Sequence, residues 1–119
     1  MGDRAMVIFH DAARKSYGPA VYIHWHGHAV GRYLAALKAL MGERLDDVEY
    51  ATARFVGIAH EDNRDALSLG VFEKPRRFND SKAFLDDYSP GDAGLFLVDA
   101  KSWEVRSFGG YGLEQEDAA

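Results

Sequence analysis

The chain has 119 residues, no cysteine and a formal net charge of −5, with 14 basic against 19 acidic side chains. This length suits a single domain over residues 1–119, and the lack of cysteine excludes disulfides, thiolate nucleophiles and cysteine-based zinc sites. The one basic cluster is Lys74-Pro75-Arg76-Arg77, which we interpret as a solvated loop, so we expect no nucleic-acid partner. No apolar run reaches the roughly 18 residues of a membrane helix. We therefore expect a cytoplasmic protein with no membrane partner.

Two strands are predicted first. Met6 to His10 is rich in β-branched and aromatic residues, and Ala20 to His26 repeats this pattern after a loop over residues 12–19. Together they predict an antiparallel hairpin. Alternation places five odd-numbered apolar side chains on a common core face: Val7, Phe9, Val21, Ile23 and Trp25. The opposite face then carries His10, Tyr22, His24 and His26.

Two helices are predicted next. From about Ala29 to Met41 the apolar residues follow three-and-four spacing, and Gly42 suits the helix end. Asp46-Asp47-Val48-Glu49 resembles a capping box, and it predicts the start of a second helix that continues to about Glu61.

The remaining elements are shorter. We predict a strand over residues 66–72 that Gly70 weakens, a helix capped by Asn79 or Asp80 that ends near Tyr88, and strands over 94–99 and 103–108. Residues 1–4 and about 110–119 are expected to be loose. The order β-β-α-α-β-α-β-β predicts an α+β fold, an antiparallel sheet of about five strands with helices packed on one face.

His24 and His26 carry the sharpest chemical signal. On an extended strand, residues i and i+2 point the same way about 6 to 7 Å apart, so two imidazoles can bind one ion with bonds of about 2.0–2.1 Å. His10 or Asp11 would add a ligand from the neighbouring strand, whereas His28 joins only if Gly27 bends the chain. Such a site suits zinc, nickel, copper or iron. The simpler interpretation is a set of polar residues on a half-exposed sheet face.

Other chemistry at this junction is less specific. Gly27 to Gly31, at a helix start, could present backbone N–H groups to an anion, or they could simply form a tight turn. Acid–base chemistry could use His24 or His26 with Asp11 as the orienting carboxylate.

The stretch from Tyr22 to Gly31, Tyr-Ile-His-Trp-His-Gly-His-Ala-Val-Gly, resembles a motif of small uncharacterised bacterial and phage-borne proteins. There the motif runs Tyr-x-His-Trp-Asp-Gly-Tyr-Pro-x-Gly, and a helix follows. The resemblance extends to Ser68-Leu69-Gly70-Val71 and to Gly91-Asp92-Ala93-Gly94 with Val98-Asp99. The chain departs from the motif at His26, His28 and Ala29. The resemblance implies a fold unit and a phage or mobile-element origin, without an activity that can be carried over.

We therefore expect a small soluble non-catalytic interaction or ligand-binding domain that needs no cofactor. Its binding residues would be Tyr22, His24, Trp25, His26 and His28. The partner would be an unknown protein or small ligand, and a homodimer through the histidine-bearing sheet face is also open. The alternative is a metal-binding protein or metal-dependent enzyme that uses zinc or another transition metal, with His24, His26 and His10 as ligands.

Overall fold

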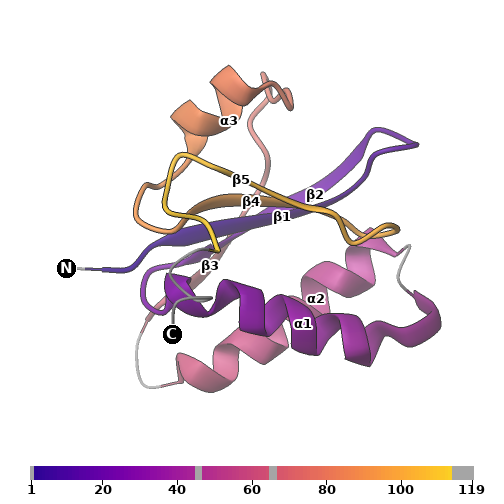
Figure 1. Cartoon of the computed structure of the whole chain (residues 1–119), viewed down its shortest axis with the longest axis vertical. Helices are drawn as coiled ribbons and strands as arrows, with labels where there is room; N and C mark the ends of the chain where they lie inside the picture. Colours follow the sequence, from indigo (N-terminus) through magenta and orange to yellow (C-terminus); the bar gives the residue numbers. More distant parts are fainter. Residues whose placement is uncertain (1, 45–46, 65–66, 114–119) are drawn as a thin grey trace.

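The computed structural model describes residues 2–44, 47–64 and 67–113, and it has one mixed five-stranded sheet with helices on both faces (Figure 1). The strand order across the sheet is β3-β2-β1-β4-β5. The strands are β1 (Ala5–Asp11), β2 (Ser16–Ile23), β3 (Leu69–Phe72), β4 (Gly94–Asp99) and β5 (Val105–Phe108). The helices are α1 (Val30–Met41), α2 (Val48–Asp62) and α3 (Lys82–Tyr88), with 3-10 turns η1 (Gly27–Ala29) and η2 (Gly42–Arg44). The order along the chain differs from the predicted one by these two turns.

The sequence predicts a purely antiparallel sheet, and this prediction is wrong because the sheet is mixed. β1 and β4 run parallel, and their register joins Ala5 with Gly94 and His10 with Asp99, whereas the other neighbouring strands are antiparallel. Every residue of β1 is buried, as are the residues of β4 before Asp99. Strands buried on both faces appear in a sequence as continuous apolar runs. The runs 5–9 and 95–98 are of this kind.

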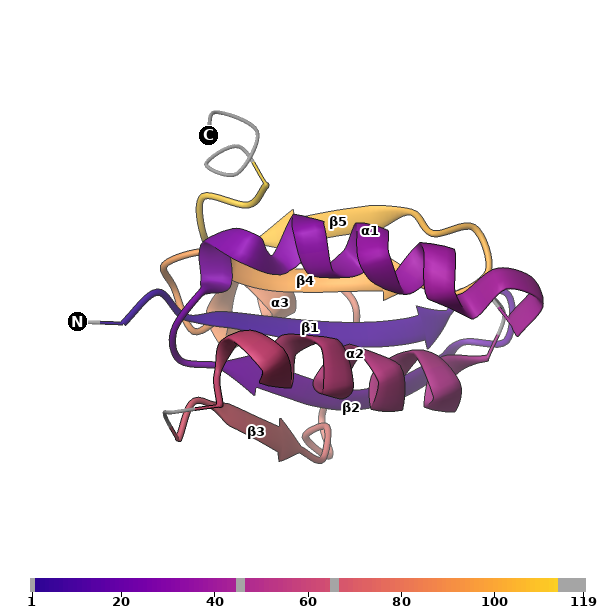
Figure 2. The same cartoon turned by 90° about the horizontal axis from the view of Figure 1, so that it is seen from below.

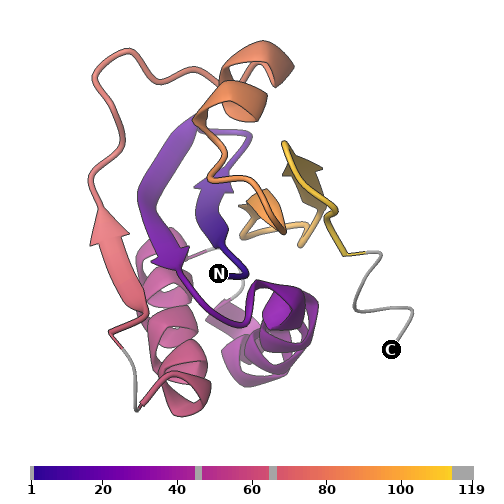
Figure 3. The ribbon, with the colours of Figure 1, turned by 90° about the vertical axis from the view of Figure 1, so that its left-hand side faces the viewer.

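Helices cover both faces of the sheet, so the predicted one-sided packing is wrong. Helices α1 and α2 lie side by side on one face (Figure 2), and α3 lies on the other (Figure 3). The α1–α2 side contains the odd-numbered residues of the first hairpin, among them Val7, Phe9, Val21 and Ile23, as the alternation predicted. The α3 side buries Met6, Ile8, Leu95 and Leu97 against Leu85. Helix α3 packs on this second apolar face and shields it from solvent.

Strand β2 begins and ends earlier than predicted, at Ser16 and Ile23. The register shifts between the pairs Ile8↔Ala20 and His10↔Tyr17, so one extra residue of β2 forms a bulge there. Gly18 and Pro19 occupy this bulge. A proline is tolerated at such a position because it need not donate to the neighbouring strand.

The helix starts follow from side-chain caps. Asp47 accepts a hydrogen bond from the N–H of Tyr50 at the start of α2, as the acidic pattern predicted, while Asp46 lies outside the described residues. Helix α3 is capped by Ser81, whose Oγ accepts from the N–H of Phe84, and not by Asn79 or Asp80. Asn79 instead accepts from the N–H of Ser81. None of the helices in the described ranges has the length and hydropathy that crossing a bilayer requires.

Candidate functional site at the strand-to-helix junction

The junction between β2 and α1 is bent rather than extended. His26 lies in the left-handed region with φ 71°, which non-glycine residues rarely adopt. At Gly27 a Cβ would collide with the carbonyl oxygen of Asp3 and would lie 3.0 Å from the Cβ of Ala93. The chain therefore leaves the sheet before His26. We predicted that the side chains of His24 and His26 point the same way from an extended strand, and this arrangement does not form.

The segment before β1 fills the inside of this bend. The N–H of Asp3 donates to the carbonyl of His24 at 2.9 Å, and the N–H of Gly27 donates to the carbonyl of Asp3 at 2.7 Å. The carbonyl of Arg4 accepts from the N–H of Ala93 at 2.9 Å. Asp3 and Arg4, which we expected in a loose end, are thus hydrogen-bonded to the junction, and Met1 lies outside the described residues.

The carboxylate of Asp3 is the centre of the junction. Its Oδ2 accepts hydrogen bonds from the backbone N–H of His28 at 2.9 Å and from Nδ1 of the same residue at 2.8 Å. Its Oδ1 accepts from the hydroxyl of Tyr111 at 2.5 Å. Burial opposes ionisation of this carboxyl, but the hydrogen bonds from Tyr111 and His28 outweigh it, so the pKa of Asp3 lies below its ordinary value.

His26 is held from a different element. Its Nδ1 lies 3.2 Å from Oδ1 of Asn63, the residue that follows α2. Asn63 is 4% exposed, and its Nδ2 donates to the carbonyl of Ala59 at 2.6 Å. The rings of His26 and His28 are neighbours, with their centroids 5.9 Å apart. The bend thus brings together His26 and His28, whereas the sequence pattern suggested His24 and His26.

Four rings, those of Phe72, Tyr22, His24 and Trp25, form an aromatic band that runs from β3 across β2 to the junction. The centroid distances are 5.9 Å for Phe72–Tyr22, 6.2 Å for Tyr22–His24 and 4.7 Å for His24–Trp25. The hydroxyl of Tyr22 also lies 3.1 Å from Nδ1 of His24. Trp25 is 38% exposed, so its predicted place in the core is wrong. The reason is that β2 has already ended at Ile23, and alternation no longer applies to Trp25.

Ser68 attaches the band to the start of β3. Its carbonyl accepts from the N–H of His24 at 2.9 Å, and its Oγ accepts from the N–H of Trp25 at 3.0 Å. Ser68 was not among the predicted site residues, and its only signal in the sequence was its position in the stretch 68–71, which carries part of the resemblance.

A cavity of about 340 Å³ adjoins the band and is lined by Gly2, Arg4, His24 and Asp92. Nε of Arg4 lies 2.9 Å from Oδ2 of Asp92, and this ion pair keeps the pKa of Asp92 below its ordinary value. Arg4 and Asp92 were not among the predicted site residues. The only signal for Asp92 was its position in the stretch 91–94, which carries part of the resemblance.

His10 lies at the other end of the β1–β2 pair. The register joins it with Tyr17, whereas Ile23 pairs with Ala5, so His10 does not reach His24 or His26 as the metal hypothesis requires. Its ring stacks on Tyr17 with centroids 5.3 Å apart and an interplanar angle of 8°. His10 is 5% exposed, and its buried Nδ1 has no hydrogen-bond partner. Burial lowers the pKa of His10, although the carboxylate of Asp99 opposes this effect.

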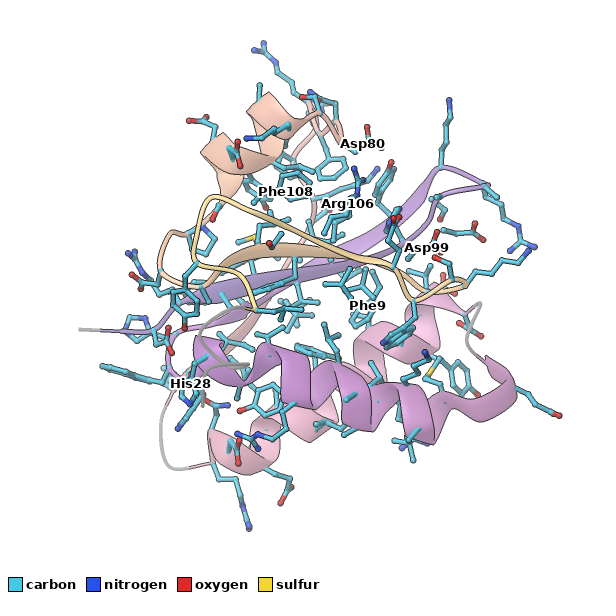
Figure 4. The ribbon with its side chains drawn as sticks, viewed as in Figure 1. Phe9, His28, Asp80, Asp99, Arg106 and Phe108 are labelled. Carbon is cyan, nitrogen blue, oxygen red and sulfur yellow. The ribbon has the colours of Figure 1, made fainter. Side chains whose placement is uncertain are left out.

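Around Tyr17 the α3 face carries further polar groups. The Tyr17 hydroxyl donates to Oδ2 of Asp80 at 2.5 Å, and burial together with this bond raises the pKa of Tyr17 to about 12. Asp80, Arg106 and Asp99 lie on this side of the sheet, far from His28 (Figure 4). Asp11, the proposed orienting carboxylate, accepts from the backbone N–H of Arg14 within its own turn. The register pairs Asp11 with Ser16, at the end of β2 that lies away from the junction histidines.

The positions of the acidic and histidine side chains bear on whether the chain can hold a metal ion. Within the described ranges, no three histidine, aspartate or glutamate side chains are grouped so that they could hold a metal ion. Comparison with known proteins found no matching family model, no matching curated protein and no matching solved structure. Segments far apart in the sequence meet at the junction: Ser68 bonds to residues 24 and 25, and Ala93 packs on Gly27.

Proposed function

We propose that the protein is a non-catalytic interaction domain that pairs with a second copy of itself through the edge strand β3. The supporting observation is where its large apolar side chains are exposed. Four of them lie on or beside β3, with exposed fractions of 38% for Trp25, 103% for Leu67, 53% for Val71 and 47% for Phe72. Large apolar side chains left exposed at a sheet edge are typical of interaction sites.

Strand β3 is an edge strand that carries neither charge nor proline. It pairs with β2 on one side and is the last strand on the other (Figure 3). Its sequence, Leu-Gly-Val-Phe, contains neither charge nor proline, the two features that commonly block pairing with another chain. The opposite edge strand, β5, differs because it carries Arg106 in its middle.

A second copy is the partner that best suits this edge. Antiparallel pairing of two identical edge strands obeys a two-fold axis, so each copy offers the other the same backbone groups and the same apolar side chains. The aromatic band continues the contact surface, and tryptophan and tyrosine are the residues that most often dominate binding energy at interfaces. Such pairing would join two five-stranded sheets into one continuous sheet.

Sedimentation equilibrium over a range of protein concentrations tests this proposal. The wild type is expected to dimerise, and Val71→Lys is expected to be monomeric, because a lysine on the edge strand repels its symmetry mate. Leu40→Lys is the matched control, since Leu40 is 59% exposed on helix α1 and should leave the dimer intact. A wild type that stays monomeric, or equal loss of dimer in both variants, would contradict the proposal. A chain that stays monomeric alone and binds only an added extended peptide would contradict self-pairing and indicate a peptide partner.

A further inference from the structure

We propose that His26 and His28 together bind a divalent transition-metal ion of the zinc, nickel or copper type, each through its Nε2 atom. The supporting geometry is the bend at residues 26–28, which places the two rings 5.9 Å apart between centroids. Two imidazoles that bind one ion through bonds of about 2.0–2.1 Å have ring centres roughly 5 to 6 Å apart. The observed separation lies at the upper end of that range.

Hydrogen bonds orient both rings in the way that metal ligands require. Nδ1 of His28 faces the carboxylate of Asp3 at 2.8 Å, so in the neutral ring Nδ1 carries the proton and Nε2 carries the lone pair. A histidine ligand commonly donates its second N–H to a carboxylate or carbonyl, which sets the tautomer and the direction of the ring. Asp3 stands in this relation to His28.

The same reasoning holds for His26. Nδ2 of Asn63 is used as a donor to the carbonyl of Ala59, so the Asn63 atom that faces His26 is the acceptor oxygen Oδ1. Nδ1 of His26 must therefore donate, and its Nε2 is again left as a lone-pair atom. Two histidines from one short bend thus present the same tautomer, each held by a buried or half-buried partner.

The pair is also accessible. The side chain of His28 is 51% exposed and lies at the outside of the junction (Figure 4). Two protein ligands leave positions for water or for a donor from another molecule, as in open metal sites. Imidazole nitrogen favours zinc, copper and nickel over calcium and magnesium. His24 lies outside this pair, since its Nδ1 is engaged with Tyr22 and its ring lies against Trp25.

The first test uses the unmodified chain without an affinity tag and Zn²⁺ alone as the probe. Long-range ¹H–¹⁵N spectra of the imidazole rings report the state of each nitrogen. We expect Nε2 of His26 and His28 to shift on addition of Zn²⁺ while their Nδ1 atoms stay protonated, with His10 and His60 unchanged. A spectrum in which His24 moves and His28 does not would overturn the proposal, as would the absence of any saturable shift.

The second test is calorimetric titration of Zn²⁺ into variants. His26→Ala and His28→Ala should each lower the affinity at least about tenfold, and Asp3→Asn should lower it by a similar factor because it loosens the orientation of His28. His24→Ala and His60→Ala are the matched controls and should leave it within about twofold. Equal loss in the controls would show non-specific binding and overturn the site. Neither test depends on dimerisation through β3. Val71→Lys tests dimerisation separately and should leave Zn²⁺ binding unchanged.

Discussion

The two ends of the β1–β2 pair hold histidines in opposite environments. At the junction, His26 and His28 lie at the surface, and each has an Nδ1 engaged by a side chain from a distant part of the chain. At the other end, His10 is 5% exposed and its buried Nδ1 has no partner. The junction side chains are ordered by hydrogen bonds, whereas His10 is placed by packing against Tyr17.

This difference shows what each end can contribute. An imidazole that is partly exposed and oriented by an acceptor is prepared to bind an ion through its other nitrogen. An imidazole that is buried without a partner carries a desolvation cost, and protonation increases that cost. The junction is therefore the end suited to binding, while His10 is expected to lower the stability of the fold in mild acid. The following substitutions test this comparison.

The largest effect is expected at Gly27. In Gly27→Ala the new Cβ would collide with the backbone of Asp3 and crowd the side chain of Ala93, and the bend would have to move. We expect a loss of about 3 kcal/mol in the free energy of unfolding, measured by urea denaturation.

Gly57→Ala is the matched control for that substitution. Gly57 lies on the exposed side of α2, and a Cβ there meets nothing within 4 Å. This variant should gain about 0.5 to 1 kcal/mol, because alanine has the higher helix propensity. Equal and small effects at both glycines would show that the junction is less tightly packed than the contacts of Gly27 indicate.

A smaller loss is expected at Asp3. Asp3→Asn removes the charge that accepts hydrogen bonds from His28 and Tyr111, and hydrogen bonds to charged groups contribute about 1.5 to 3 kcal/mol each. Because the side chain is 28% exposed and asparagine still offers one acceptor, we expect a net loss of about 2 kcal/mol at neutral pH. Asp87→Asn, on the exposed surface of α3, is the control and should change stability by less than about 0.5 kcal/mol.

In contrast to the preceding losses, His10→Leu is expected to increase the free energy of unfolding. The substitution removes the buried Nδ1 that has no partner at nearly constant volume, and leaving such an atom unsatisfied costs about 1 to 3 kcal/mol. Some of this gain is offset by the lost stacking on Tyr17, so we expect a net gain of about 1 kcal/mol. A clear loss of stability would indicate that His10 makes a favourable polar contact.

The pH dependence gives an independent test of His10. Its pKa in the folded state is lowered from the ordinary value of 6.5, so the unfolded chain binds the proton more readily. Stability is then complete above pH 6.5 and declines as the pH falls below that value. His10→Leu should flatten this decline, while His60→Gln, at the exposed end of α2, should retain it. Identical pH profiles for wild type and His10→Leu would contradict the lowered pKa.

Much of the fold could be predicted from local patterns. Alternation located the core-facing residues Val7, Phe9, Val21 and Ile23, and three-and-four spacing located α1 and α2. The pattern failed at Trp25, because the periodicity of a strand carries no information about where the strand stops. It also missed Pro19 as part of a strand, because a bulge is defined by the register with β1.

The candidate site was predicted in part. The junction and its residues were apparent from their composition, but the grouping of His24 with His26 depended on an extended backbone. The bend at His26 replaces that grouping with His26 and His28. Asp3 and Asn63, which orient the two rings, are 25 and 37 residues away from them along the chain. No spacing rule connects positions that far apart.

The sequence by itself determined which residues alternate or recur in each element, since side-chain direction follows the period of a strand or a helix. It also determined that polar rings gather between Tyr22 and His28. Only the tertiary structure decided that β1 runs parallel to β4, that α3 covers the second face of the sheet, and which partner each histidine has. These features arise from contacts between distant segments, whose relative position depends on the packing of the whole chain.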